Sequence, residues 1–492
     1  MSKHLIYQML PRLWGEGKFS SVDSAFLAYV KSMGFDYIWY TGIVRHATSA
    51  TEKVVKGDAG SPYAITDWYD VNPYMATDPA RRMEEFRELL RRTHEAGLKV
   101  LIDFVPNHVA REYSGAMTPA GEPVLGADDD VNEHWSPDND FYYYPGEALY
   151  MPYVDGYSEF PARASGNAFT PAPSADDWYE TVKLNYCNWR TPTWDKMLAV
   201  LRFWASAGVD GFRCDMVELV PPQFMQWAIS TVKRDYPSLM FVAEVYEKDK
   251  YEMYVHEVGF DLLYDKSGLY DTLRAIMCSG APASGITANW QFLGALQPSM
   301  LCFLENHDEQ RVASDFFAGS ASAAYAAVAV SLLLNDSSFM LYFGQEIGER
   351  GMDCEPFSGL NGRTTIFDWW QVASLQRLRS WIDNHRCGLQ PSERLVLKRY
   401  TSLLALASEP VFSEGLTYDL CYCQGPGFDR SRHFAFLRST GSVTVLVITN
   451  FGPSAKITVQ IPAKALRFLD TPLDPRTLTL SVPSNDFVVV RL

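Results

Sequence analysis

The chain has 492 residues and a formal charge of −16, from 43 lysines and arginines against 59 aspartates and glutamates. Such a length suits one large barrel with an appended domain, or two to three ordinary domains. Hydrophobic residues make up 47% of the chain and charged residues 21%, a composition that excludes a largely disordered chain. The acidic balance offers no basic surface, so we expect neither nucleic acid nor a membrane among the partners.

Eight short runs of apolar, β-branched or aromatic residues recur along the chain and are predicted to be strands. They are residues 4–9, 35–40, 99–104, 209–214, 239–244, 259–264, 300–304 and 338–343. Amphipathic helical stretches separate most of them, for example 80–96, 193–207 and 223–235. This alternation predicts an α/β protein with a closed (β/α)8 TIM barrel. A doubly wound open sheet is the alternative, but nothing resembles its Gly-rich dinucleotide turn.

Two segments interrupt this alternation. Residues 109–185 lack a helical period and are rich in Pro, Gly, Asp and aromatics, so we expect an inserted irregular subdomain after the third strand. After about residue 410 the apolar period becomes two, which predicts a C-terminal antiparallel β domain, a β-sandwich. The expected division is therefore barrel over 1–108 and 186–410, insertion over 109–185, and β-sandwich over 411–492.

Signals for export are weak. The first residues contain no long apolar segment, and the best apolar run, around 321–334, is broken by Ser331. We therefore expect a cytoplasmic location, with a secreted protein that has lost its leader as the alternative. The eight cysteines include no CxxC pair, so a reduced chain without disulfides is expected.

Carboxylates stand at the ends of several predicted strands. Asp215 follows the fourth strand, Glu244 ends the fifth and Asp308 follows the seventh. The carboxyl ends of barrel strands meet at one mouth, where barrel enzymes carry their catalytic groups. Repulsion among clustered carboxylates raises at least one pKa, so that like groups can serve as acid and base. Two flanking carboxylates are also what cleavage of a glycosidic bond requires.

The strand-end segments read Asp103-x-x-x-Asn107-His108, Gly211-x-Arg213-x-Asp215, Glu244 and Asn306-His307-Asp308. Together with residues 6–12 and 63–73, they resemble the signature segments of the alpha-amylase family of glycoside hydrolases. The resemblance covers the whole chain and mixes neopullulanase- or cyclomaltodextrinase-like with alpha-amylase-like features. The high aromatic content, 14%, is interpreted as a large core or as a sugar site, in which flat rings would cover the apolar faces of the sugars.

The resemblance implies three catalytic roles. Asp215 would be the nucleophile that forms a glycosyl-enzyme, with Arg213 favouring its ionised form. Glu244 would be the general acid and then the general base for the incoming water. Asp308 would hold sugar hydroxyls and favour the distorted transition state.

It also implies substrate-binding roles. His108 and His307 would donate hydrogen bonds to hydroxyls of the sugar being cleaved, and Tyr63 would stack on that sugar. Asp103 is interpreted as a structural anion at the strand end. A core-packing role is the alternative for Tyr63.

Several positions depart from the family pattern. Residues 216–219 lack the Lys-His pair that holds the leaving side of starch in endo-amylases, and 182–185 match the neopullulanase-like variant. Asn107 matches a calcium ligand, but Asn185 stands where we expect its carboxylate partner. We therefore expect that no cofactor is required, with calcium as an option and the metal ligands unknown. The acidic run 128–130 is interpreted as a solvated loop, with calcium binding as the alternative.

The expected function is a retaining glycoside hydrolase that cleaves α-glucosidic bonds of maltooligosaccharides or starch fragments. The first alternative is a transglycosylase or isomerising member of the family, and the second is an inactive carbohydrate-binding homologue. The expected partner is an oligosaccharide, and the oligomeric state is left open. Because the Lys-His pair is missing, we expect a pocket or short cleft closed on one side by the insertion.

Overall fold

The computed structural model describes residues 3–187, 190–384 and 387–492. Eight parallel strands close into a barrel in the order β1-β14-β13-β12-β11-β10-β5-β2. The strands are β1 (Leu5–Met9), β2 (Tyr37–Tyr40), β5 (Lys99–Phe104), β10 (Gly211–Cys214), β11 (Met240–Ala243), β12 (Leu262–Tyr264), β13 (Met300–Cys302) and β14 (Ser338–Tyr342). Each lies inside one of the eight predicted runs, so the prediction of a TIM barrel is confirmed.

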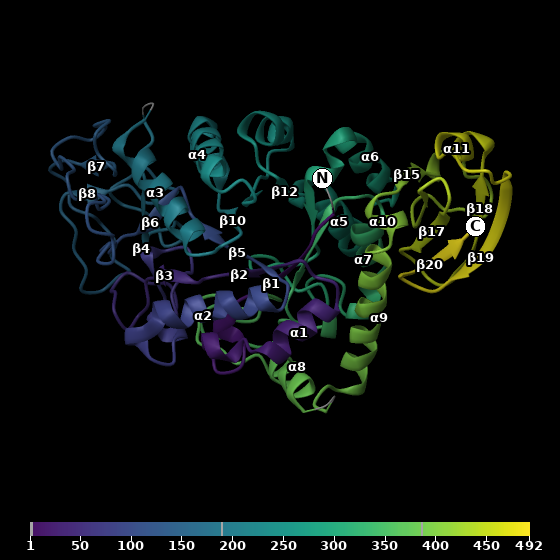
Figure 1. The fold of residues 1–492 in the computed structure, drawn as a ribbon, viewed down its shortest axis with the longest axis horizontal. Coiled ribbons are helices and arrows are strands. Elements are labelled where there is room, and N and C mark those ends of the chain that lie inside the picture. Colours follow the sequence, from purple (N-terminus) through teal and green to yellow (C-terminus); the bar gives the residue numbers. More distant parts are fainter. Residues whose placement is uncertain (1–2, 188–189, 385–386) are drawn as a thin grey trace.

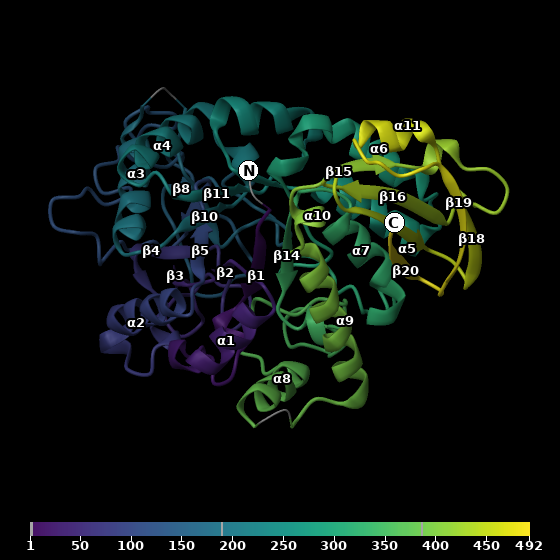
Figure 2. The ribbon, with the colours of Figure 1, turned by 45° about the vertical axis from the view of Figure 1, so that its right-hand side comes forward.

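Helices surround these strands, with the inserted segment at one end of the molecule and the C-terminal sheets at the other (Figures 1 and 2). The predicted helices 80–96, 193–207 and 223–235 correspond to α2, α3 and α4. The helices are α1 (Ser24–Ser32), α2 (Arg82–Glu95), α3 (Pro192–Ser206), α4 (Pro222–Asp235), α5 (Asp271–Ser279), α6 (Ser284–Leu293), α7 (Tyr325–Leu333), α8 (Ala373–Asp383), α9 (Pro391–Ala407), α10 (Pro410–Ser413) and α11 (Ala463–Phe468).

Helix α2 shows how the sequence pattern becomes structure. It buries Phe86, Leu89 and Leu90, which share one face at helical spacing, while its charged residues stay outside. The chain then leaves the helix through Gly97, whose φ of 74° lies in the left-handed region that glycine adopts without strain.

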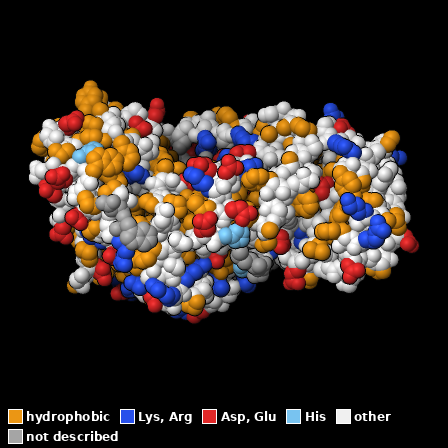
Figure 3. Space-filling view, turned by 90° about the horizontal axis from the view of Figure 1, so that it is seen from above, with side chains coloured by type: hydrophobic (Ala, Val, Ile, Leu, Met, Phe, Trp, Pro, Cys, Tyr) orange, Lys and Arg blue, Asp and Glu red, His pale blue; other side chains and the backbone are white. Residues whose placement is uncertain are grey.

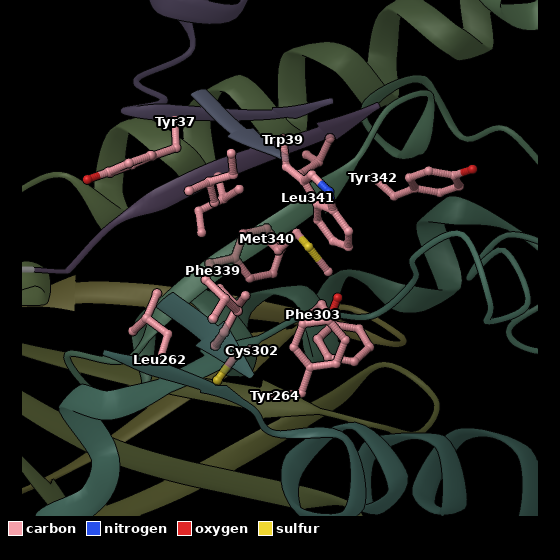
Figure 4. Close-up of a cluster of buried hydrophobic side chains, with 14 of the residues drawn as sticks. Tyr37, Trp39, Leu262, Tyr264, Cys302, Phe303, Phe339, Met340, Leu341 and Tyr342 are labelled. Carbon is pink, nitrogen blue, oxygen red and sulfur yellow. The ribbon is translucent and has the colours of Figure 1, made fainter. Parts of the chain in front are cut away.

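The barrel interior is filled by large apolar side chains, several of them aromatic (Figure 4). Tyr264 of β12 and Phe303 beyond β13 pack with ring centroids 5.0 Å apart. At Gly211 in β10 the neighbouring strand is so close that a Cβ would lie 2.3 Å from the Met240 carbonyl oxygen. Only glycine fits there, which explains the first residue of the Gly211-x-Arg213-x-Asp215 segment.

Two excursions leave the barrel on the side of the strands' carboxyl ends. The first is an antiparallel pair after β2, and the second is the long segment after β5. Their strands are β3 (Val44–His46) with β4 (Ile65–Val71), β6 (His108–Ala110) with β9 (Thr181–Lys183), and β7 (Tyr143–Tyr144) with β8 (Ala162–Arg163). The long segment is held by the buried Arg111 side chain, which donates to the carbonyl oxygens of Tyr179 and Thr181 and pairs with Glu159 at 2.9 Å. Hydrophobic side chains are exposed at this end of the molecule (Figure 3), including Trp135, Phe160 and Phe169.

The C-terminal region contains one four-stranded antiparallel sheet, ordered β15-β16-β17-β20, and one two-stranded sheet, β18-β19. Its strands are β15 (Leu416–Asp419), β16 (His433–Ser439), β17 (Thr444–Asn450), β18 (Ala455–Ile461), β19 (Arg476–Val482) and β20 (Asp486–Arg491). The predicted antiparallel β structure is thus present, although the sequence pattern did not reveal β15 or β19.

The apolar run around 321–334 is helix α7, which is buried along almost its whole length. Arg438 of β16 is fully buried and donates to the Leu334 carbonyl oxygen at 3.1 Å, just beyond the end of this helix. The helix is apolar because the barrel and the C-terminal sheet both contact it. No helix in the described parts of the chain is both long and apolar enough to cross a membrane.

Candidate active site

A cavity of about 290 Å³ lies at the carboxyl ends of the barrel strands. It brings together Asp215, Glu244, Asp308, Tyr63 and His108, five of the seven predicted site residues. The carboxylates follow β10, β11 and β13, and the other two come from the two excursions. Larger cavities lie elsewhere on the described part of the chain, including those of about 900 and 720 Å³ among outer helices. The barrel mouth is therefore singled out by its chemistry rather than by its size.

Arg213 lies behind the cavity and links two of the carboxylates. Its Nη1 donates to Asp215 Oδ1 at 2.6 Å, and its Nη2 lies 2.8 Å from Glu244 Oε1. The contact with Asp215 is a directed hydrogen bond, whereas the Nη2 contact has no hydrogen-bond geometry. All three side chains are almost entirely buried, so one guanidinium charge faces two carboxyls that are shielded from water.

The buried charges shift the pKa of Asp215. Burial raises the pKa of this carboxyl well above its usual range, Arg213 opposes the shift, and the neighbouring Glu244 adds to it. The expectation that Arg213 holds Asp215 ionised is therefore incomplete, because burial and a second carboxyl act in the opposite direction. Arg213 carries a single positive charge and can balance only one of the two negative charges, so its attraction does not cancel the effects of burial and of Glu244 on Asp215.

Glu244 is held by two groups that the sequence did not single out. Its Oε1 accepts a hydrogen bond from Tyr246 Oη at 2.8 Å, and its Oε2 accepts from the Met216 backbone N–H at 2.9 Å. Met216 adopts a left-handed backbone conformation with φ of 44°, which is uncommon for a residue other than glycine. Tyr246 is two positions after Glu244, and this proximity was the only sequence signal for it.

Asp308 forms a second cluster with His307 and Tyr63. Asp308 Oδ2 lies 3.0 Å from His307 Nε2, and Gln8 Nε2 contacts His307 Nδ1 at 2.8 Å. Tyr63 hydrogen-bonds His307 Nε2, and the two rings stack with centroids 5.3 Å apart. Partial removal from water raises the pKa of the Asp308 carboxyl, but the attraction and hydrogen bond of His307 outweigh this effect and lower the pKa below its usual value.

Asp103 connects the cluster around Arg213 with the cluster around His307. Its carboxylate accepts hydrogen bonds from Tyr63 Oη and the Gly42 backbone N–H, both at 3.2 Å, and lies 3.9 Å from Arg213 Nη1. Tyr63 therefore has a polar partner at its hydroxyl besides its ring contacts. This geometry agrees with the interpretation of Asp103 as a structural anion.

His108 is buried at the cavity wall, with its ring 5.2 Å from that of Trp178. Burial and the nearby Lys183 ammonium lower the pKa of His108 to about 3. The imidazole is thus neutral near neutral pH. The Asn107 side-chain N–H donates to its Nδ1 at 3.1 Å, which leaves Nε2 as the protonated donor nitrogen.

The residues around Asn107 do not fit a calcium ion. Its side-chain oxygen accepts from the Lys183 ammonium, which also contacts the Leu219 carbonyl oxygen at 3.2 Å. A second cation at this oxygen would be repelled. Asn185, which stands where a carboxylate partner of Asn107 is expected, donates its side-chain N–H groups to the Ser136 and Asn139 carbonyl oxygens. Among the described residues, no three His, Cys, Asp or Glu side chains gather in a metal-binding group.

The acidic run 128–130 is partly engaged in local structure. Asp129 accepts hydrogen bonds from the backbone N–H groups of Asp140 and Phe141 and from Tyr143 Oη. Its carboxylate therefore organises the aromatic stretch of the insertion.

The fold and the site define a (β/α)8-barrel protein with an acidic pocket at the carboxyl ends of its strands, the position at which barrel enzymes carry their active sites. The chain belongs to the alpha-amylase family, since the model of the alpha-amylase catalytic domain matches residues 17–388.

Curated relatives show the same similarity. Alpha-amylase 3 of Dictyoglomus thermophilum is 28% identical over 307 residues, covering 59% of this chain and 54% of the relative. Alpha-amylase MalA of Haloarcula japonica is 26% identical over 363 residues, covering 70% of this chain and 44% of the relative. The chain thus spans about half the length of these relatives.

Solved structures share the fold over nearly the full length. The cyclic alpha-maltosyl-(1→6)-maltose hydrolase of Arthrobacter globiformis superposes with a TM-score of 0.68 at 18% identity, covering 99% of this chain and 98% of that one. An alpha-amylase of Lactobacillus plantarum gives a TM-score of 0.64 at 19% identity, with 99% and 98% covered.

Proposed function

We propose that the protein is a retaining glycoside hydrolase that cleaves α-glucosidic bonds of maltooligosaccharides or starch fragments. The observation that carries the proposal is the Arg213 guanidinium between Asp215 and Glu244, two carboxyls that line the cavity together with Asp308. A single guanidinium spans only a short gap. Such spacing suits a retaining pair, whose carboxyls are about 5 Å apart, rather than an inverting pair, which leaves room for a water.

The first step needs one proton on the carboxyl pair. Asp215, which accepts the directed hydrogen bond from Arg213, is assigned as the ionised nucleophile, and Glu244 as the protonated acid. Asp215 bonds to the anomeric carbon while the glycosidic C–O bond breaks, and the proton of Glu244 moves to the leaving oxygen. In the second step, Glu244 takes a proton from water, whose oxygen replaces Asp215 at the anomeric carbon.

The remaining site residues would bind the sugar. Asp308 is half-exposed in the cavity and can accept hydrogen bonds from hydroxyls, and the neutral His108 can donate one from Nε2. Tyr63 is fixed by Asp103 and His307, so its ring can support the sugar without losing side-chain freedom on binding. These groups would strengthen their contacts as charge develops on the sugar ring.

We further propose that catalysis needs no calcium. The Lys183 ammonium stands beside the Asn107 oxygen and supplies a positive charge that is part of the chain. The hydrogen bond between Lys183 and Asn107 links the start of the insertion to its end, since Asn107 precedes β6 and Lys183 ends β9. Because the Lys183 ammonium is part of the polypeptide, a chelator cannot remove it.

The test is product analysis. Maltoheptaose, pullulan, cyclodextrin and trehalose are incubated separately with the protein, and proton NMR follows the anomeric configuration of the first products. We expect cleavage of the maltooligosaccharide with α-configured products at early times. Products of β configuration, or no cleavage of any α-glucan, would overturn the proposal.

A further inference from the structure

We propose that the ion pair of Lys56 and Glu180 closes the glycone end of the cavity, so that the protein removes short units from the non-reducing ends of α-glucan chains. This inference rests on the proposed function and adds a direction of attack to it. Neither residue belongs to the strand-end motifs, and each comes from a different excursion above the barrel.

The ion pair is almost buried although it lines an open cavity. Lys56 Nζ lies 3.2 Å from Glu180 Oε2, and the side chains are only 15% and 5% exposed. Lys56 Nζ also donates to the Asp177 carbonyl oxygen at 2.9 Å and lies 4.9 Å from the centroid of the Tyr179 ring. The ammonium therefore has three partners in the insertion and ties the excursion after β2 to it.

The loop that carries Lys56 is also fixed from behind. The Ala59 backbone N–H donates to the Phe367 carbonyl oxygen at 2.9 Å, and Arg12 Nη1 donates to the Ala59 carbonyl oxygen at 3.3 Å. Gly57 has φ of 67°, and a Cβ there would lie 2.3 Å from the same Phe367 oxygen. Since Phe367 lines the cavity too, the loops after β2 and β14 form one continuous wall.

The insertion completes this wall. The Glu180 carbonyl oxygen accepts from the Arg111 N–H at 2.8 Å, and Arg111 itself is anchored by Glu159. Trp178, two positions earlier, lines the cavity and contacts the His108 ring. The charged pair is therefore held on a backbone that has little freedom to move away.

The side of the cavity at Glu244 is more open. Tyr246, which lines the cavity and donates to Glu244, is 36% exposed, against 15% and 5% for the side chains of Lys56 and Glu180. The Glu218 carboxylate accepts from the Tyr246 N–H and holds the loops after β10 and β11 together at 2.9 Å. A leaving chain that takes its proton from Glu244 has a path to solvent here.

The reaction chemistry relates the two sides of the cavity to the two ends of the glucan chain. The sugar that bonds to Asp215 through its anomeric carbon lies on the non-reducing side of the broken bond, and the leaving chain lies on the reducing side. A wall on the glycone side limits the transferred unit, whereas the leaving chain is not limited. The cavity volume of about 290 Å³ is at the low end for small-molecule pockets, which suits a short glycone.

Charged side chains suit the end of such a pocket. The Lys56 ammonium can donate to sugar hydroxyls, and the Glu180 carboxylate can accept from them, so a terminal sugar can replace the water at the wall. A chain that continued past this point would have to break the ion pair and bury its charges unpaired, which is costly. The pair thus favours chain ends over internal segments.

The experiment uses maltohexaose with a chromophore at its reducing end, with or without a blocking group on the non-reducing sugar. Product chromatography gives kcat/KM for both substrates. We expect the wild-type protein to prefer the unblocked substrate by 100-fold or more. Lys56→Met and Glu180→Gln keep side-chain size but remove the pair, and each should lower this preference at least tenfold by improving cleavage of the blocked substrate.

Lys53→Ala is the matched control, because Lys53 Nζ ties the same loop to the Gly156 carbonyl oxygen at 3.0 Å but does not line the cavity. It should keep the wild-type preference. Equal wild-type cleavage of blocked and unblocked substrate overturns the inference while leaving the proposed function intact, as does an unchanged preference in both pair variants. No cleavage of either substrate by the wild-type protein refutes the proposed function itself.

Discussion

His46 is predicted to make the protein sensitive to acid. It is almost fully buried in β3, where its Nδ1 donates to the Val44 carbonyl oxygen at 3.0 Å. Its Nε2 faces Arg12 Nη1 at 3.2 Å and Asn72 Nδ2 at 3.1 Å, so this nitrogen must accept and the ring must be neutral. Burial, together with the Arg12 charge, lowers the pKa of His46 to about 3.

The sign and size of the effect follow from this pKa. Between pH 6.5 and 3 the unfolded chain binds a proton at His46 and the folded chain does not, so stability falls as the pH falls through this window. The pKa difference between the unfolded and the folded chain corresponds to about 5 kcal/mol in the free energy of unfolding. Within the window this free energy changes by up to about 1.4 kcal/mol per pH unit. Arg12 also donates to the carbonyl oxygens of Ala59 and Ile366, so a protonated His46 would place a second positive charge beside a side chain that joins two loops.

The assay is urea unfolding followed by tryptophan fluorescence at several pH values. His46→Gln keeps a donor and an acceptor but does not titrate, so the wild-type protein should lose about 2 kcal/mol more than this variant between pH 6.5 and 4.5. His256→Gln, at a largely exposed histidine, is the control and should keep the wild-type slope. Parallel pH dependence in the wild-type protein and His46→Gln would refute the reasoning.

Three further predictions concern the proposed chemistry and the calcium question. Asp215→Asn should fold normally, by circular dichroism, yet lose at least 10³-fold in kcat because an amide cannot form the glycosyl ester; a variant with a tenth of the wild-type rate would exclude this role. Glu244→Gln should lose far more activity on maltotriose than in the first, burst turnover of an activated aryl α-glucoside, whose leaving group needs little protonation; equal losses in pre-steady-state measurements would contradict its role as the acid. EDTA should leave the wild-type Tm unchanged, whereas Lys183→Met should lower stability by about 2 kcal/mol through loss of the charge-assisted hydrogen bond to Asn107; a Tm drop with EDTA that calcium reverses would show a site that we have not identified.

The barrel and its carboxylates could be predicted because their signals are local. Each barrel strand is a continuous apolar run. Such a run can be recognised in the sequence without knowing which segments pack against it. Asp215 and Glu244 directly follow strands, and parallel strands in a barrel place their carboxyl ends together, so the juxtaposition follows from the fold class. The strands β3, β4 and β19 carried weaker signals, since β4 is buried on both faces without forming part of the barrel and β19 is largely exposed.

The amino-acid pattern was thus enough to predict the barrel, the order of its strands along the chain and the identity of the groups at its mouth. The surroundings of those groups became visible only in the folded chain. Lys183 meets Asn107 across 76 positions, and Lys56 meets Glu180 from another excursion, although no periodicity or motif connects either pair. Such contacts depend on how irregular loops pack over the barrel, which is set by hydrogen bonds and burial between distant segments rather than by the preferences of neighbouring residues. For the same reason the pKa of Asp215 could not be read from its neighbour Arg213, because burial, which is a property of the folded chain, has the larger effect.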